Sequence, residues 1–478
     1  METPIALQSA EGTEGMVACR NSQGLDIRAT LVHFTRYLAV FELYTPSVIL
    51  RASEVLSDFK ITLDTRLAYS GRAVISNLIS AGAVLLCEAN LGEGWIDLNS
   101  GLGSGPAGLG TEFDAFLKRW QTSYKVLPEF KLVVADMQSL LADMHLWLDQ
   151  VELAIRSSPS GERIEMMREA ARTVARPALR AIESLGDRFE EVAGRLEREL
   201  RPPHIHFTRR NLHATLLSSP FAYRTFYKPL GYAGDYEMVN MIARDPYEGG
   251  SLFACVVNAW FLQQLPAEAH RNRLKILKQK LIEETARMAR AGRPAKVFNL
   301  GCGPASEIRD FLTDSDLCDQ AQFTLLDFNE ETIQHTGALL REASSRFGRR
   351  TLIQLQKKSV QQLLRDAIRA GTQSNGAKFD YVYCAGLFDY LPDRICKQLI
   401  SALYDLLAPG GLLLVTNVDG TRPFRNKLEF ILDWNLIYRT GPQLAELRPD
   451  VVAADACTVT ADLSGVNVFL EIRKPSNE

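Results

Sequence analysis

The residues best placed for chemistry are Gly301, Cys302 and Gly303, which directly follow a short apolar run at 297–300. Such a run predicts a buried strand, and the glycines predict a sharp turn in which no Cβ keeps a ligand away from the backbone. Pro304 suits the first position of a helix, and apolar residues at helical spacing follow it. A strand, a glycine turn and a helix in this order form the start of a nucleotide-binding βαβ unit.

A carboxylate stands at the end of the next predicted strand. The apolar stretch Phe323–Leu326 ends at Asp327. In dinucleotide folds an acid at this place accepts hydrogen bonds from the ribose hydroxyls. The glycines alone are a weak signal, but the glycines, the spacing and Asp327 together predict a nucleotide-type site.

Two motifs, LGCGP at 300–304 and LLDFN at 325–329, resemble the first two motifs of class I methyltransferases, which use S-adenosylmethionine. Two later stretches agree with them. Phe379–Cys384 resembles the fourth strand of that family, and Leu407–Gly411 resembles the turn into its fifth strand. The resemblance covers about 295–474 and implies an enzyme of EC class 2.1.1 with a Rossmann-like fold.

The resemblance also implies an S-adenosylmethionine site beyond the carboxyl ends of the strands. Gly301 and Gly303 would border the methionine part, and Asp327 would take the ribose. Phe328 is either a core residue or a partner that stacks on the adenine. The implied set is Asn299, Gly301, Cys302, Gly303, Asp327, Phe328, Ser359, Val360, Ala385 and Gly386, with Ser359 and Val360 flanking the adenine.

One residue departs from the family pattern, which often has an acid where Asn299 stands. An amide can hydrogen-bond but contributes no charge. A nicotinamide cofactor fits less well, because Ser306 occupies the place of the third glycine of GxGxxG. Cys302 could be reactive, but a small filler beside the ligand is the favoured interpretation.

Composition restricts the other functions. The 478 residues carry a formal net charge of −3, which gives no overall nucleic-acid footprint. No apolar run is long enough to span a membrane, and the acidic N-terminus lacks the basic start of a signal peptide. The eight cysteines are scattered without a CxxC pair, which favours reduced thiols in the cytoplasm over a zinc site or disulfides. His204 and His206 have no further ligand at metal spacing, so no metal is expected.

The N-terminal part predicts a small β-barrel. Residues 1–24 read as a mobile tail, and residues 25–100 contain five or six β-rich runs with no helix between them. The stretch SGRAVISNLISAGAVLLCEANL weakly resembles a PilZ domain, a barrel family that often binds cyclic di-GMP. Arg66 and Arg72 could meet its phosphates, although the RxxxR motif is absent. A structural barrel without ligand is favoured.

A glycine-rich linker at 101–111 precedes a helical region at 112–203. Apolar residues from Leu127 to Ile155 step by threes and fours over four heptads, which is typical of a coiled-coil seam. A second helix follows after 157–161. Two interpretations stay open: an antiparallel hairpin within one chain, or a homodimer seam.

The connector at 204–292 contains YKPLGYAGDYE at 227–237, a segment dense in aromatic residues and glycines. Its position before the Rossmann-like domain at 293–478 suggests a lid over the cofactor and acceptor sites. In that hypothesis Tyr232, Asp235 and Tyr236 are the catalytic residues and Tyr227 contacts the substrate. The alternative, a packed connector between domains, is equally favoured.

The acceptor is harder to derive. In GTRPFRNKLEFILDWNLIYRTGP, Arg422, Arg425 and Tyr438 could hold an anionic head on an apolar tail. The favoured alternative is an ordinary amphipathic helix with a solvated charged face. A carboxylate acceptor would need no general base, because it is ionised near pH 7.

The stretch from SSPFAYRTFYKPLGYAGDYE through the glycine turn is similar to bacterial proteins that make 3-hydroxypalmitate methyl ester, a signal. The resemblance implies a carboxyl O-methyltransferase acting on a 3-hydroxy fatty acid. A second hypothesis is a regulatory protein that senses S-adenosylmethionine or a nucleotide through a degenerate domain. A third, a polyamine-synthase-like transferase, would need a cluster of acids, and the candidate loops are basic.

Overall fold

The computed structural model describes residues 15–44, 48–63, 66–81, 84–92, 94, 126–159, 162–370 and 378–476, with isolated positions at 110, 113–114 and 117–118. The predicted linker at 101–111 lies almost wholly outside these residues. The chain forms two compact units. The first, here the barrel–helix unit, comprises the chain up to Ala233, Pro246–Phe261 and Pro423–Asn435. The second, the sheet unit, comprises Gly234–Asp245, Leu262–Arg422 and the chain from Leu436.

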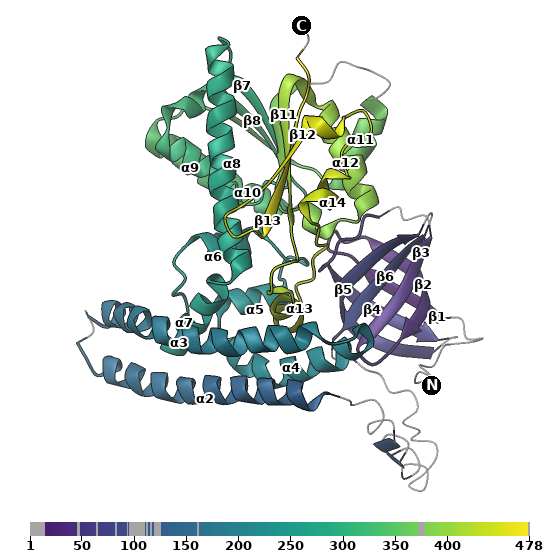
Figure 1. Cartoon of the computed structure of the whole chain (residues 1–478), viewed down its shortest axis with the longest axis vertical. Coiled ribbons are helices and arrows are strands. Elements are labelled where there is room, and N and C mark those ends of the chain that lie inside the picture. The colour runs from purple at the N-terminus through teal and green to yellow at the C-terminus, as the bar shows by residue number, and fades with distance from the viewer. Residues whose placement is uncertain are drawn as a thin grey trace. The chain divides into compact units, whose positions relative to one another are not determined.

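The barrel–helix unit contains the predicted barrel, which is confirmed as six antiparallel strands closed in the order β1-β2-β3-β6-β5-β4 (Figure 1). The strands alternate buried and exposed residues, so one face of each lines the barrel core. That core includes Phe41 and Phe59. The strands are β1 (Gly15–Arg20), β2 (Asp26–Phe34), β3 (Leu38–Tyr44), β4 (Val55–Leu63), β5 (Arg66–Ala81) and β6 (Val84–Leu91).

The barrel begins at Gly15, inside the stretch 1–24 that was expected to be a tail. The reason is the alternation in GMVACR, where Gly15, Val17 and Cys19 are buried and the residues that alternate with them are exposed. This short alternation is the pattern of a half-buried strand. It pairs with both β2 and β4 and closes the barrel.

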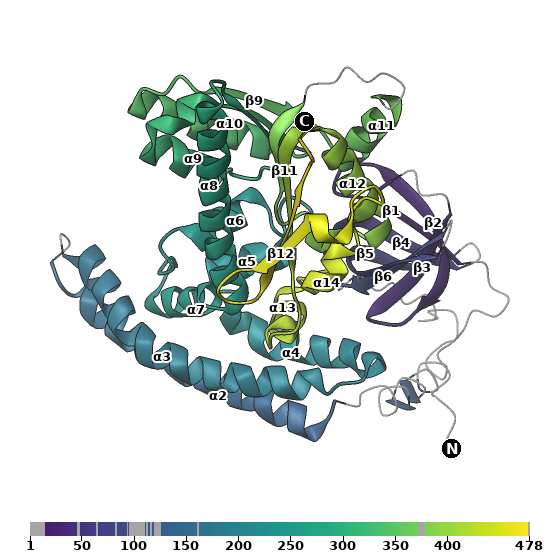
Figure 2. The ribbon, with the colours of Figure 1, turned by 45° about the horizontal axis from the view of Figure 1, so that its top comes forward.

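The helices of the barrel–helix unit whose bounds are described are α2 (Pro128–Arg156), α3 (Arg163–Gly194), α4 (Arg201–Leu216), α5 (Pro220–Tyr227), α7 (Leu252–Leu262) and α13 (Arg425–Leu432). The two long helices α2 and α3 run antiparallel, side by side (Figures 1 and 2). Phe130, Met137 and Leu148 of the predicted seam are buried on α2. The hairpin therefore closes within one chain, which is one of the two arrangements that the sequence left open.

The sheet unit has seven strands in the order β12-β13-β11-β10-β7-β8-β9. Neighbouring strands from β11 to β9 are parallel, and β13 runs antiparallel to both β11 and β12. The predicted α/β fold with a terminal hairpin is thus confirmed. The strands are β7 (Ala295–Leu300), β8 (Ala321–Asp327), β9 (Leu352–Lys357), β10 (Phe379–Cys384), β11 (Leu407–Val418), β12 (Cys457–Ala461) and β13 (Asn467–Arg473).

Helices cover both faces of this sheet (Figure 1). On one face lie α8 (Leu265–Arg290), α9 (Ser306–Asp314) and α10 (Glu330–Phe347); on the other lie α11 (Val360–Ala370), α12 (Asp393–Asp405) and α14 (Gly441–Ala445). The short α6 (Tyr236–Ala243) also belongs to this unit. The strand order reverses between β7 and β10, and ligands of open α/β sheets bind beyond the carboxyl ends at such a switch point.

None of the described helices combines the length and the apolar character needed to cross a bilayer.

Candidate active site

The glycine turn after β7 is tightly held but open on its ligand side. Gly301 and Gly303 have positive φ angles of 70° and 48°, and the N–H groups of Gly301 and Cys302 both donate to the Leu326 carbonyl at 2.8 and 3.0 Å. A Cβ on Gly303 would meet no atom within 4 Å. The helix begins at Ser306 rather than at Pro304 as expected, because Ala305 adopts a left-handed φ of 48°.

Asp327 is fixed directly beside this turn. Its Oδ2 accepts a hydrogen bond from Gly303 N at 3.2 Å, and its Oδ1 accepts one from Asn329 N at 3.0 Å. The side chain is buried. Because a carboxylate offers about four acceptor positions, this arrangement orients the group and still allows it to accept from a ligand diol.

The carboxyl end of β10 brings an unexpected residue to the site. Gly386 has a φ of 86°, and its N–H donates to Thr416 Oγ1 at 3.0 Å. A Cβ on Gly386 would lie 3.1–3.3 Å from the guanidinium of Arg273, on α8. Arg273 was not predicted from the sequence, because no local motif marks it: it lies on a helix that precedes β7.

An acid is also present beside Asn299. The Asn299 side-chain amide donates to Glu307 Oε1 at 3.4 Å, and the Tyr383 hydroxyl donates to the same oxygen at 2.7 Å. All three side chains are buried. Burial raises the pKa of Glu307, and the hydrogen bond from Tyr383 opposes that shift. Glu307 was missed, although it stands only four residues after Gly303 in the motif.

Asp389 lies just after β10, in the short turn Phe388–Tyr390. Its Oδ1 accepts from Val418 N at 2.7 Å, which ties β10 to the end of β11. Burial raises the Asp389 pKa to about 6, while the charges of Arg273 and Arg439 oppose the shift. This carboxyl therefore belongs to the electrostatic surroundings of Arg273.

Two further residues of the implied cofactor set, Cys302 and Ser359, lie just after the ends of β7 and β9. Burial raises the pKa of Cys302 well above its ordinary value, and the charges of Asp327 and Glu307 add to the shift. Its thiol therefore stays protonated, as suits a small filler. Ser359 and Gln362 bond reciprocally at the start of α11, with Ser359 Oγ accepting from Gln362 N at 3.2 Å.

The three residues expected to be catalytic are divided between the units. Tyr232 belongs to the barrel–helix unit, where the Arg51 guanidinium lies 5.3 Å from its ring centroid. Asp235 and Tyr236 belong to the sheet unit. Asp235 Oδ1 accepts from Met238 N at 2.9 Å and caps α6, and the Tyr236 hydroxyl donates to Glu331 at 2.7 Å.

The residues expected to bind substrate are divided too. Tyr227 and Arg425 lie in the barrel–helix unit, and Arg422 and Tyr438 lie in the sheet unit. Arg425 forms an ion pair with Glu429 at 2.6 Å. The Tyr438 ring packs against Gly420, where a Cβ would lie 2.8 Å from it.

Helix α13 corrects the expectation of a solvated amphipathic helix. All its residues from Asn426 to Leu432 are buried. The Glu190 carboxylate accepts from the N–H groups of Asn426 and Lys427 at 2.8 and 2.9 Å, which satisfies the start of the helix. A charge-rich helix can be buried here because its neighbours supply the partners for its polar groups.

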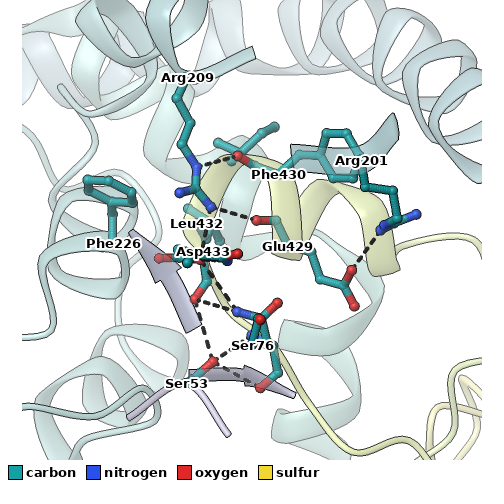
Figure 3. A network of polar contacts seen from close by, with 12 residues as sticks. Ser53, Ser76, Arg201, Arg209, Phe226, Glu429, Phe430, Leu432 and Asp433 are labelled. Carbon is teal, nitrogen blue, oxygen red and sulfur yellow. Dashed lines mark hydrogen bonds and ion pairs between the residues drawn. The ribbon is translucent and has the colours of Figure 1, made fainter. Parts of the chain in front are cut away.

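Asp433, directly after α13, is the centre of a polar network within the barrel–helix unit (Figure 3). It forms an ion pair with Arg209 at 2.9 Å and accepts from the amide of Asn90, on β6, at 2.9 Å. Ser53 donates to the Asn435 carbonyl at 2.9 Å. Burial acts to raise the Asp433 pKa, but the nearby cations outweigh it and hold the pKa well below the ordinary range.

Arg72, one of the two arginines that could meet cyclic di-GMP, forms hydrogen bonds within the barrel–helix unit. Arg72 Nη2 donates to the carbonyls of Phe226 and Tyr227 at 3.2 and 3.3 Å. The side chain of Arg66 lies outside the described residues.

Across the described part of the chain, no three or more His, Cys, Asp or Glu side chains gather in a way that could hold a metal ion. His204 instead accepts a hydrogen bond at Nε2 from Leu127 N at 3.0 Å. Burial lowers the pKa of this histidine, so it acts as a neutral acceptor in the helical region.

Comparison with known proteins supports these assignments at the level of the domain. The family described as "Methyltransferase domain" matches residues 298–413, from the strand before the glycine turn into β11. No curated protein matches the chain.

Three solved structures resemble it in part. A possible exported protein from Bordetella parapertussis is 15% identical, with a TM-score of 0.38, and covers 74% of this chain and 99% of its own. Magnesium protoporphyrin IX methyltransferase from Synechocystis PCC 6803 is 13% identical, with a TM-score of 0.34 and coverage of 53% and 97%. N-methyltransferase NodS from Bradyrhizobium japonicum WM9 is 16% identical, with a TM-score of 0.30 and coverage of 50% and 98%. These TM-scores are too low to assign an activity to this chain.

The family match covers the glycine turn, Asp327 and the end of β10, which are the elements that build the site. Residues 298–413 therefore match a methyltransferase domain.

Proposed function

We propose that this chain transfers the methyl group of S-adenosylmethionine to a small-molecule acceptor, and that the first acceptor to test is the carboxylate of a 3-hydroxy fatty acid. The observation that carries the proposal is the position of Asp327. Its carboxylate is oriented by Gly303 N and Asn329 N at the end of β8, beside a turn with open space at Gly303. This geometry suits a ribose next to a methionine part.

The residues fit the cofactor in order along the sheet. Gly301 and Gly303 leave room for the methionine part, Asp327 accepts the ribose hydroxyls, and Ser359 with Val360 flanks the adenine. Phe328 adds a flat apolar surface for the adenine. Ala385 and Gly386, at the end of β10, complete the wall.

When bound, the cofactor supplies a sulfonium-activated methyl group whose carbon–sulfur bond breaks as the bond to the acceptor oxygen forms. The chain contributes alignment and exclusion of water, which are the main requirements of an in-line displacement. No residue has to remove a proton from an ionised carboxylate. This matches a site in which the buried acids already serve as hydrogen-bond acceptors.

For the acceptor, the members of the predicted set that belong to the sheet unit are Arg422 and Tyr438, with Asp235 and Tyr236 at the reacting centre. Arg422 is the more available cation, since it is exposed and Arg425 is paired with Glu429. Two side chains of the segment 227–237 have structural contacts within the sheet unit. Asp235 caps α6, and the Tyr236 hydroxyl donates to Glu331.

The test is formation of S-adenosylhomocysteine from S-adenosylmethionine with 3-hydroxypalmitate, palmitate or a short hydroxy acid, with the methyl ester identified by mass spectrometry. Turnover with an acid substrate is expected for the wild type and for Asp310→Ala, which removes an exposed carboxylate from α9. It should be lost in Asp327→Ala. Cofactor binding without turnover on any acceptor would contradict the enzymatic proposal and favour a sensing protein.

A further inference from the structure

Arg273 brings a positive charge to the switch point of the sheet from outside the matched domain. It lies on α8, and its guanidinium packs over Gly386 at the end of β10, so closely that a Cβ there would be 3.1 Å from Nη2. Burial lowers the pKa of Arg273, and the charges of Asp389 and Glu307 oppose that shift. The guanidinium thus lies at the carboxyl end of β10, the strand that pairs with β7, where the methionine part is expected.

The charge of Arg273 is not matched by an ion pair. Among the described residues, no carboxylate lies within ion-pair distance of its guanidinium, and its hydrogen bond goes to Nδ1 of His270 at 2.7 Å. His270 is buried, and burial with two neighbouring arginines lowers its pKa well below the ordinary value. The imidazole is therefore neutral and accepts from Arg273. Its buried Nε2 has no hydrogen-bond partner within the described chain.

A second unsatisfied group lies at the start of α9. Ser306 is buried, and its Oγ has no hydrogen-bond partner among the residues that the structure describes. Ser306 is the first residue of a nine-residue helix that follows the glycine turn. Helix starts favour anions because their first N–H groups are free and the helix dipole is positive there. Two elements of the sheet unit, α8 and the start of α9, therefore each offer a group that suits an anion.

We propose that Arg273 binds the carboxylate of the amino-acid part of S-adenosylmethionine, with the start of α9 as a second anion-binding element. This inference rests on the proposed function and names the group that selects the cofactor. A planar guanidinium suits a carboxylate, which it can bind with two parallel hydrogen bonds. His270 is a positioning residue, since it holds the guanidinium through Nδ1.

The consequence is selectivity for a cofactor that carries its carboxylate. A decarboxylated analogue would leave Arg273 without its anion in a largely buried place, and such unpaired groups discriminate strongly between ligands. One charge-assisted contact accounts for about tenfold to hundredfold in affinity. Removing the guanidinium should abolish that preference.

The test is a cycle of two ligands and four proteins, measured by titration calorimetry on the full chain. The ligands are S-adenosylhomocysteine and its decarboxylated analogue. The proteins are the wild type, Arg273→Gln, Arg273→Lys, and Lys275→Gln, which removes an exposed cation from the same helix. We expect the wild type and Lys275→Gln to prefer the carboxylate ligand about tenfold to hundredfold. Arg273→Gln should bind both ligands about equally, and Arg273→Lys should keep part of the preference.

Two failures are distinguishable. If the wild type binds S-adenosylhomocysteine and Arg273→Gln keeps the full preference, this inference is wrong and the proposed function stands. If the wild type binds neither ligand, the proposed function fails as well. Should Arg273→Gln not fold, Arg273→Lys decides, because an undiminished preference in that variant would contradict bidentate binding.

Discussion

At the scale of single residues, Lys228 is a buried lysine whose charged neighbours include Arg72 and Arg209. Its side chain is 3% exposed, and its Nζ donates to the Leu432 carbonyl at 3.3 Å. Burial lowers its pKa to about 7, the charge of Asp433 opposes the shift, and the charges of Arg72 and Arg209 add to it. The folded chain therefore releases this proton far below the pH at which the unfolded chain does.

This shift predicts the sign of a pH dependence. Between about pH 7 and 10.5 the unfolded chain holds the Lys228 proton and the folded chain has released it, so stability from this residue rises with pH in that window. Urea unfolding of the wild type and Lys228→Met should show the wild type gaining up to roughly 3–5 kcal/mol relative to the variant from pH 7 to 10. The exposed Lys275→Met is the control, and a constant wild-type–Lys228→Met difference would refute the assignment.

At the same scale, charge is arranged in an unexpected way around Asn299. Asn299 cannot supply the acid that the family often has there, but its amide contacts Glu307, which also accepts from Tyr383. The negative charge is thus displaced from the strand to the first turn of α9. An acid at the start of a helix also complements the helix dipole.

At the scale of elements, α13 and the residues after it are built into the barrel–helix unit through Asp433. Its carboxylate faces Arg209, Lys228 and Arg72, and the loop after it binds Ser53 of the barrel. Removing one partner from a buried charged group leaves the others uncompensated. Asp433 is therefore one of the residues on which this attachment depends.

Asp433→Asn is predicted to destabilise the barrel–helix unit by about 3–5 kcal/mol at neutral pH, because the half-buried arginines Arg209 and Arg72 lose their counter-charge. The matched control is Asp26→Asn, which makes the same substitution in an exposed ion pair with Arg20 and should cost less than about 1 kcal/mol. Denaturant unfolding followed by circular dichroism measures both. Equal effects for the two variants would show that the network adds no stability.

At the scale of the whole molecule, the two units share the chain in several passes. The chain crosses between them after Ala233, Asp245, Phe261, Arg422 and Asn435. The segment 423–435, which lies between β11 and β12 in the sequence, thus belongs to the barrel–helix unit. The units cannot be separated by cutting a single linker.

Features that depend on a local sequence pattern could be predicted, and features that depend on packing between distant segments could not. The glycine turn, Asp327 and the terminal hairpin were predictable, because each depends on a local pattern of strand, turn and spacing. Arg273 was not, since its role arises from the packing of α8 against the end of β10. The burial of α13 was not either, because its partner Glu190 lies on α3, far away in the sequence. The early strand β1 was missed because six residues give a weak signal.

The central claim is that the ends of β7 and β8 hold S-adenosylmethionine through Asp327. Calorimetric titration of the wild type, Asp327→Ala and Asp310→Ala with S-adenosylmethionine and S-adenosylhomocysteine tests it most directly. We expect binding by the wild type and Asp310→Ala, and a loss of affinity of at least about tenfold in Asp327→Ala, because that variant loses charge-assisted hydrogen bonds. Equal affinity of Asp327→Ala and the wild type, or no binding to the wild type, would contradict it.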